Sequence, residues 1–428
     1  MEFKLISFFG FWTFAALAWA TGGRRAFNFR TFAGAAGLAW VLGAIVFMFP
    51  GSRSALSWLN DALVGLIVAS QKGAVFLFGP LALGPGQTLP DGTRSVGFIL
   101  AVQVLPSVIF FSAIVGALYY LKVMQGIVGL FAKLFYKFLG VSGAESLAAA
   151  SNIFVGVESG IAVRPFLRSM TRSELLMILT CMMATVASTV LGIYVIALKD
   201  VIPNIAGHLV SASIISIPCA AVAAKLFLPE EDRPETLGRI PEEIRFSEQD
   251  AGKTEGASNL MTALLDGGAQ GMKMAVGIAT ALIVALGVEA IIDLALTGLP
   301  SVSGQDLSLE RIMGWLTLPF VALLGLNPEE WQAAARILGS RFIETEVASY
   351  FSLAALQAGD AALSPRSVII LAYSLCGFVH LASFGIFVGG LSALVPERMR
   401  EISVLGMKAL WTSFLATLMT GSIAGVFV

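Results

Sequence analysis

The sequence predicts an all-α polytopic membrane protein, and its composition is the first reason. Of its 428 residues, 57% are hydrophobic and 13% are charged, whereas a soluble domain carries roughly 25% charged residues. The apolar residues also gather into long continuous runs, which lack the in–out alternation of a membrane β-barrel. Such runs are stable in lipid, where a spanning helix needs about 20 consecutive apolar residues.

Seven stretches without charged residues supply most of the predicted helices. They are residues 5–23, 31–50, 95–121, 175–198, 202–224, 368–395 and 409–428. The first stretch could also be a secretory signal that begins at Lys4 and has a cleavage-like Ala-Trp-Ala at 18–20. We favour a retained helix, because further spans follow at once and Arg24 and Arg25 would anchor its end on the cytoplasmic side. The N-terminus would then lie outside.

The next segments are less uniform. Residues 55–78 are apolar but contain Asp61 and Lys72, so we expect them to lie at the membrane interface. Residues 79–97 hold five glycines and three prolines, which is typical of an exposed connection.

A polar loop at residues 229–258 divides the chain into two halves of similar design. Residues 123–173 in the first half and 311–357 in the second are interrupted apolar segments with carboxylates inside them. A long uncharged span follows each segment. Paired broken segments in corresponding positions indicate a transporter whose site lies near the middle of the bilayer. Between the halves, residues 259–298 predict one long helix.

Glu158 is the candidate carboxylate of the first half. It lies in an apolar stretch between Gly156 and Gly160. A charge at membrane depth costs at least about 2.5–3.5 kcal/mol, so it needs a partner or a function. Glu158 could form an ion pair with Arg164 or Arg168. Alternatively, it could accept a hydrogen bond from a solute hydroxyl at the tip of a re-entrant hairpin.

The second half offers Glu346 and His380. Arg341 and Glu344 are three residues apart and could pair on a helix, which leaves Glu346 as the candidate for function. His380 lies within the uncharged run 368–395. It could be a neutral imidazole bound to a backbone carbonyl, a solute contact, or a proton-coupling group, since imidazole titrates near physiological pH.

Other classes of function find little support in the sequence. The net charge is −1, and no dense basic cluster indicates a nucleic-acid partner. No HExxH, P-loop or GxSxG motif is present, so we expect neither enzyme catalysis nor an organic cofactor. The three cysteines lie inside apolar runs and are expected to be core residues.

Four blocks of the sequence, taken together, are distinctive. The blocks are Phe76-Leu77-Phe78-Gly79-Pro80 with Val104-Leu105-Pro106-Ser107-Val108-Ile109-Phe110-Phe111-Ser112, then Glu145-Ser146 with Ser151-Asn152-Ile153-Phe154-Val155-Gly156, then Leu338-Gly339-Ser340-Arg341 leading to Glu346, and last Ser374-Leu375-Cys376-Gly377-Phe378 with Gly389-Gly390 and Pro396-Glu397-Arg398. In this order they resemble the concentrative nucleoside transporter family, whose members couple solute uptake to sodium or protons. The likeness runs from about residue 57 to the C-terminus.

The resemblance implies about eight transmembrane helices plus two re-entrant helical hairpins in inverted repeats. It also implies a homotrimer in a bacterial inner membrane, with an elevator-like transport domain in each protomer. In this scheme residues 1–121 hold the N-terminal scaffold helices and an interfacial helix, and 122–228 form the first transport repeat. Residues 229–258 are the polar loop, 259–300 a long scaffold helix, and 301–428 the second transport repeat.

The family's binding residues can be carried over position by position. Sodium would be bound by oxygen atoms of Asn152, Val155, Thr185 and Val186, ligands that suit a hard cation. Solute contacts would fall on the hairpin tips and on the two following helices, at Val157, Glu158, Val190, Glu346, Phe378, His380 and Ser383.

The solute-reading positions depart from the family pattern. The first hairpin tip of the family usually reads Gly-Gln-Thr-Glu-Ala-Pro, but here the stretch 156–160 is one residue shorter before Arg164. The glutamine that would read the nucleobase is therefore Val157 or is deleted, and Glu158 replaces either the glutamate or its threonine neighbour. His380 stands where an asparagine would hold the ribose. Because unpaired buried polar groups are costly, such changes alter which solute is accepted.

Three functions remain in view. The first is sodium-coupled uptake of a nucleoside or a nucleoside-like polar solute. The second is a proton-coupled carrier of a non-nucleoside solute, which His380 and the carboxylates suggest. The third is a sensor or assembly subunit that keeps the fold without transporting, which the altered hairpin tip suggests.

Overall fold

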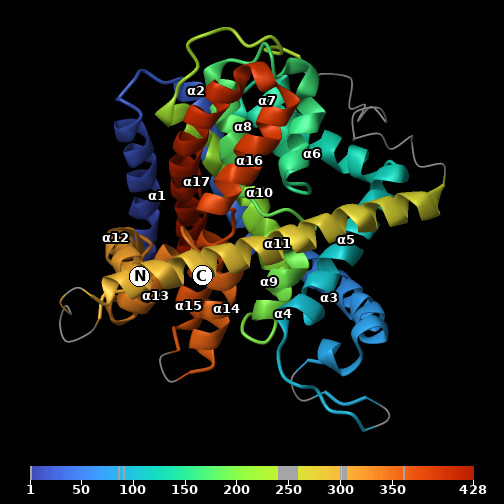
Figure 1. Ribbon diagram of the computed structural model, residues 1–428. Helices are drawn as coiled ribbons and strands as arrows, with labels where there is room; N and C mark the ends of the chain where they lie inside the picture. The colour runs from blue at the N-terminus through green and yellow to red at the C-terminus, as the bar shows by residue number, and fades with distance from the viewer. Residues whose placement is uncertain are drawn as a thin grey trace.

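The computed structural model describes residues 2–84, 87–89, 92–239, 259–298, 300, 306–359 and 362–428, and these residues form a helical protein (Figure 1). The first half contains α1 (Glu2–Thr21), α2 (Phe29–Met48), α3 (Pro50–Phe78), η1 (Gly79–Ala82), α4 (Leu100–Gln103), α5 (Leu105–Tyr120), α6 (Val123–Leu139), α7 (Gly143–Asn152), η2 (Val157–Phe166), α8 (Arg172–Ala184), α9 (Leu191–Leu198) and α10 (Ile205–Phe227). The second half contains α11 (Leu260–Leu296), α12 (Leu309–Leu323), η3 (Pro328–Glu330), α13 (Trp331–Ser340), α14 (Glu346–Gln357), α15 (Pro365–Ser374), α16 (Leu381–Leu394), η4 (Pro396–Arg398) and α17 (Met399–Phe427). The predicted all-α class is confirmed.

Seven helical stretches of the described residues are long and apolar enough to cross a bilayer. They are Glu2–Thr21, Phe29–Met48, Ser54–Ala82, Leu100–Tyr120, Ile205–Phe227, Leu260–Leu296 and Pro396–Phe427. Two of the uncharged stretches form broken helices. Residues 175–198 fall on α8 and α9, and residues 368–395 fall on α15 and α16.

The predicted interfacial segment at residues 55–78 forms one continuous helix, and its position at the membrane interface stays a prediction. The helix α3 runs without interruption through both Asp61 and Lys72 and belongs to a stretch long enough to span. Both charged residues are exposed. Breaking the helix beside them would leave backbone groups that lipid cannot satisfy, and a lysine stem can carry its charge towards water.

The helices form a bundle, and a pair made of α5 and α11 lies against it. The helices α10 and α17 are largely buried and lie among α1, α2, α8 and α15. The long helix α11 runs obliquely across the bundle in Figure 1 and packs chiefly on α5. Glycines make this contact close: a Cβ at Gly267 would lie 2.6 Å from the Ser112 carbonyl oxygen, and one at Gly271 would lie 2.7 Å from the Ile109 Cα. Small residues four apart are a common membrane packing device.

Candidate functional site

The first break in the chain lies between α7 and η2, and it is fastened to the break between α8 and α9. The N–H and Oγ of Ser188 both donate to the carbonyl of Phe154, at 3.1 and 2.6 Å. Oγ1 of Thr185, the first residue after α8, lies 3.3 Å from the carbonyl oxygen of Asn152. Backbone groups left without helical partners at one break are thus hydrogen-bonded by residues of the other.

The predicted sodium ligands come together at this junction. Asn152 ends α7, Val155 lies in the first break, and Thr185 and Val186 open the second. All four are buried. The carbonyl of Val186 lies 3.5 Å from Oγ of Ser213 on α10. The junction therefore concentrates carbonyl, hydroxyl and amide oxygens, which are the ligands of hard cations.

The side chain of Asn152 is held by three neighbours. In the amide orientation that satisfies all of them, its NH2 group faces the carbonyl of Gly156 at 3.2 Å and Oγ of Ser159 at 2.8 Å. Its oxygen then accepts from the backbone N–H of Met182 at 3.3 Å. The amide orientation is assigned from this network. Asn152 thereby joins the first hairpin, formed by α7 and η2, to α8.

The second hairpin, formed by α13 and α14, is fastened to the break between α15 and α16 in a similar way. The N–H of Leu381, which opens α16, donates to the carbonyl of Phe342 at 3.1 Å. The buried guanidinium of Arg341 donates to the carbonyls of Ser374 and Gly377 at 2.5 and 3.0 Å. The expected pairing of Arg341 with Glu344 was therefore wrong, because its donors satisfy carbonyls freed where α15 ends.

Glu346 lies at the centre of the site. It is the first residue of α14 and is 4% exposed. Its Oε1 accepts a hydrogen bond of 2.7 Å from the hydroxyl of Tyr194 on α9, and its Oε2 lies 2.7 Å from Nε2 of His380. The glutamate thus joins the second hairpin to both broken helices. A carboxylate at a helix N-terminus is also favoured by the helix dipole.

His380 is fixed in one tautomer by its own helix. It is the N-cap of α16, and its Nδ1 accepts from the backbone N–H of Ser383 at 3.1 Å. The neutral ring therefore carries its proton on Nε2, beside Glu346. The hydroxyl of Ser383 lies 2.6 Å from the His380 carbonyl and also bonds the Phe378 carbonyl. Ser383 supports the cap in this structure, and its predicted solute contact remains a prediction.

Two polar atoms at the site, Oγ1 of Thr345 and Oγ1 of Thr189, have no hydrogen-bond partner among the described residues, and both residues are buried. Oε2 of Glu346 and Nε2 of His380 are partners of each other, 2.7 Å apart. A buried group without a partner costs about 1–3 kcal/mol, so the site is suited to a solute that supplies the missing bonds.

The structure describes two more of the predicted solute residues, Val190 and Phe378, and both lie near these breaks. Val190 is buried in the break before α9, and the ring of Phe378 lies 6.4 Å from that of His380. The side chains of Val157 and Glu158 lie outside the described residues. The predicted contact between Glu158 and the solute therefore stays a prediction. Of its two alternative partners, Arg168 pairs with Glu397 at 2.5 Å.

Sequence reasoning missed Tyr194, Thr189 and Thr345. Tyr194 and Thr189 lie in the uncharged run 175–198, which looked like a plain membrane span. A tyrosine in the middle of such a run is a usable signal, because its hydroxyl needs a partner when it is buried.

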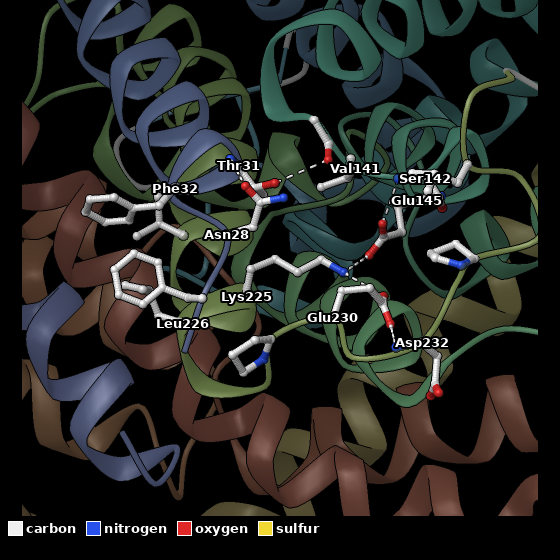
Figure 2. A pocket seen from close by; sticks show the side chains of 16 residues that line it. Asn28, Thr31, Phe32, Val141, Ser142, Glu145, Lys225, Leu226, Glu230 and Asp232 are labelled. Atoms are coloured by element: carbon white, nitrogen blue, oxygen red, sulfur yellow. Dashed lines mark hydrogen bonds and ion pairs between the residues drawn. The ribbon is translucent and has the colours of Figure 1, made fainter. Parts of the chain in front are cut away.

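A cavity of about 180 Å³ lies elsewhere, at the base of the first hairpin (Figure 2). It is lined by the start of α2, by Ser142 and Glu145 at the start of α7, and by Lys225 near the end of α10. Nζ of Lys225 lies 2.6 Å from Glu145 and 3.4 Å from Glu230. These charges satisfy one another, and the residues that line the cavity include none of the hairpin tips. We therefore assign it a structural role.

Comparisons with known proteins agree with this geometry. Family models for the N- and C-terminal parts of the Na⁺-dependent nucleoside transporters match residues 9–81 and 208–425, and a nucleoside recognition ("Gate") model matches 101–200. The chain is 32% identical to the nucleoside permease NupC of Helicobacter pylori over 99% of this chain and 98% of that protein. This chain belongs to the Na⁺-dependent nucleoside transporter family. The four resembling blocks thus led to the correct family.

Further relatives of the transporter include an uncharacterized transporter of Haemophilus influenzae, 32% identical over 95% of this chain and 93% of that one. The rat sodium/nucleoside cotransporter 1 is 33% identical, and the match covers 99% of this chain and 64% of the rat protein. Among solved structures, CNTnw in an inward-facing substrate-bound state superposes with a TM-score of 0.87 at 32% identity, covering 99% and 98% of the two chains. A CNTnw variant in an outward-facing state gives 0.86 at 30% identity, covering 100% and 98%.

Proposed function

We propose that the protein carries a nucleoside or a nucleoside-like solute into the cell and couples this uptake to sodium. The observation that supports this proposal best is the buried contact between Oε2 of Glu346 and Nε2 of His380, 2.7 Å apart. A sugar hydroxyl that replaces this contact can donate to the carboxylate and accept from the imidazole. The solute would thus satisfy two buried groups in one step.

Two re-entrant hairpins, α7–η2 and α13–α14, would present the site from opposite sides. The helices α7, α13 and α14 have 10, 10 and 12 residues, or about 15–18 Å. Each is about half the length needed to cross a hydrocarbon core of about 30 Å. Backbone breaks at that depth must face protein or a cavity, and here they bond to the following broken helices.

Sodium would link the two parts of the site. An ion held by Asn152, Val155, Thr185 and Val186 would fix the tip of the first hairpin against α8. The same chain break holds Thr189 and Val190, and Tyr194 lies one turn into α9. Ordering this break with an ion would place the Tyr194 hydroxyl, which bonds Glu346. Ion binding would therefore prepare the solute site.

Each hairpin and its broken helix would move as one unit against α5 and α11, which pack chiefly on each other. The helices α1 and α2 pack against α10 and α17. This packing favours placing them with the moving unit, and not with a scaffold of residues 1–121. We further propose that the protein forms a homotrimer in a bacterial inner membrane, as the family resemblance suggests.

Uptake into proteoliposomes tests the function. Labelled uridine and adenosine should accumulate with an inward sodium gradient and not with choline in its place. Competition by free bases, ribose and 2′,3′-dideoxynucleosides would show whether sugar hydroxyls are required. Accumulation that follows a pH gradient and ignores sodium would favour the proton-coupled alternative. Binding without accumulation would favour the sensor.

A further inference from the structure

The helix α6 has two distinct faces. Its buried residues are Met124, Val128, Ala132, Phe135 and Leu139, and this face packs against α7 and α2. The opposite stripe is exposed and has the same spacing of three and four residues, at Val123, Gly126, Leu130, Lys133 and Lys137. Leu130 is 68% exposed. The exposed stripe is therefore apolar in its first half and basic in its second.

The basic half of this stripe lacks an acidic partner within the part of the chain that the structure describes. From residue 92 to residue 144 the chain contains cations but no Asp or Glu. Among the described residues, no carboxylate forms an ion pair with Lys133 or Lys137. Lys137 instead extends over the ring of Phe138, 5.7 Å from its centroid. Its position in the last helical turn suits the helix dipole, but that does not account for Lys133.

The basic end of α6 adjoins further basic and aromatic residues. Oγ1 of Thr31 lies 3.3 Å from the carbonyl oxygen of Gly140, so the end of α6 meets the start of α2. Arg30 and Phe29 are exposed beside this contact, and Phe29 is 71% exposed. Exposed aromatic rings mixed with cations are typical of the level of lipid head groups. The apolar half of the stripe would face the hydrocarbon.

We propose that Lys133 and Lys137, together with Arg30, bind the phosphate groups of anionic lipids. Cations at a membrane surface gain about 1 kcal/mol each from anionic lipid. The apolar stripe continues into lysines that form no ion pair with another described residue, and this order matches the acyl and head-group regions of one lipid. A second copy of the chain would need a carboxylate for each lysine. Because α7 begins three residues after Gly140 and packs on α6, bound lipid would hold the base of the first hairpin at the membrane surface.

The test uses the full-length protein in mixed micelles of detergent and phosphatidylcholine, with phosphatidylglycerol titrated in and bound lipid counted by native mass spectrometry. The double variant Lys133→Gln/Lys137→Gln should bind phosphatidylglycerol roughly 30-fold more weakly, the change expected from two charges worth about 1 kcal/mol each. The matched control is Lys199→Gln, at an exposed lysine after α9, and it should bind like the unchanged protein.

A structural role for the lysines predicts different results. In that case the double variant would unfold at a lower temperature in phosphatidylcholine alone, without any change in lipid affinity. Equal binding by the double variant and the unchanged protein would overturn the proposal. So would a loss of subunits from the complex in place of a loss of lipid, because the stripe would then lie between copies of the chain.

Discussion

Nε2 of His380 lies 2.7 Å from Oε2 of Glu346, and each residue begins a helix that follows a chain break. The side chains come from two different structural units, the second hairpin and the α15–α16 pair. Their contact joins these two units across the site. A solute must therefore compete with His380 for the carboxylate, which makes this pair the natural place to test recognition.

Replacing Glu346 with Gln should weaken solute binding by roughly 10- to 100-fold, because hydrogen bonds to a charged group are worth about 1.5–3 kcal/mol. Tyr194→Phe should cost less, since it removes one donor and leaves the carboxylate. Isothermal titration with the solute at saturating sodium measures both. The control is Glu329→Gln, at an exposed carboxylate before α13. Unchanged affinity in Glu346→Gln would remove Glu346 from the site.

Substitutions of His380 should separate its role as the N-cap of α16 from its role in solute recognition beside Glu346. Asparagine can cap a helix and can also donate to Glu346, so His380→Asn should stay within several-fold of the original uptake rate. His380→Ala removes both functions, and losing the cap alone costs about 1 kcal/mol. Uptake is measured at several pH values. A pH dependence that disappears in His380→Asn, while sodium dependence is absent throughout, would contradict sodium coupling.

Thr185→Ala should raise the sodium concentration needed for half-maximal uptake by several-fold, because it removes one of the few oxygen ligands of the proposed ion. Solute affinity at saturating sodium should change little. Sodium titration of the initial uptake rate gives both values. Thr180→Ala is a suitable control, since that hydroxyl lies on the same helix and contacts Leu176 and Thr412. Equal effects of the two variants would place sodium elsewhere.

Lys225→Met should strongly destabilise the protein. It leaves Glu145, which is 1% exposed, without its partner, and breaking a buried pair costs about 3–5 kcal/mol. Arg25→Gln removes an exposed pair with Glu231 and should cost less than about 1 kcal/mol. Thermal unfolding in detergent compares the two. Similar midpoints would mean that water reaches the Lys225 cluster.

Arg341→Lys should also destabilise the protein, by about 2–3 kcal/mol, although the charge is kept. A lysine cannot donate to the carbonyls of Ser374 and Gly377 in the geometry of the guanidinium fork. Arg336→Lys, on the exposed face of α13, should be nearly neutral. An Arg341→Lys protein as stable as the original would show that the α15–α16 break does not depend on this clamp.

The helical class could be predicted from composition, because apolar runs of this length have few alternatives to membrane helices. The chain breaks in 175–198 and 368–395 could not be located by their composition. Neither run carries a proline or a charge at the break, so a continuous helix is the default expectation. The breaks are stabilised by partners far along the sequence, such as Ser188 with Phe154 and Arg341 with Gly377.

Glu346 was found from sequence because a carboxylate in an apolar segment needs an explanation. Its neighbours were harder to assign. Spacing suggested a pair between Arg341 and Glu344, but the guanidinium turns to carbonyls that only the folded chain brings near. Tyr194 was missed because a tyrosine in an apolar run resembles a packing residue until its hydroxyl is seen to meet the carboxylate.

The length of α11 has a consequence for the membrane around the protein. Its 37 residues extend about 55 Å, whereas the hydrocarbon core is about 30 Å thick. Such a helix tilts or projects beyond the core into water, and any tilt depends on the thickness of the surrounding bilayer. Since α11 and α5 are held together by glycine contacts, they would tilt together. Lipids with longer acyl chains should therefore turn both helices more upright. They should also change the distance that the hairpins and their broken helices move relative to α5 and α11 during transport.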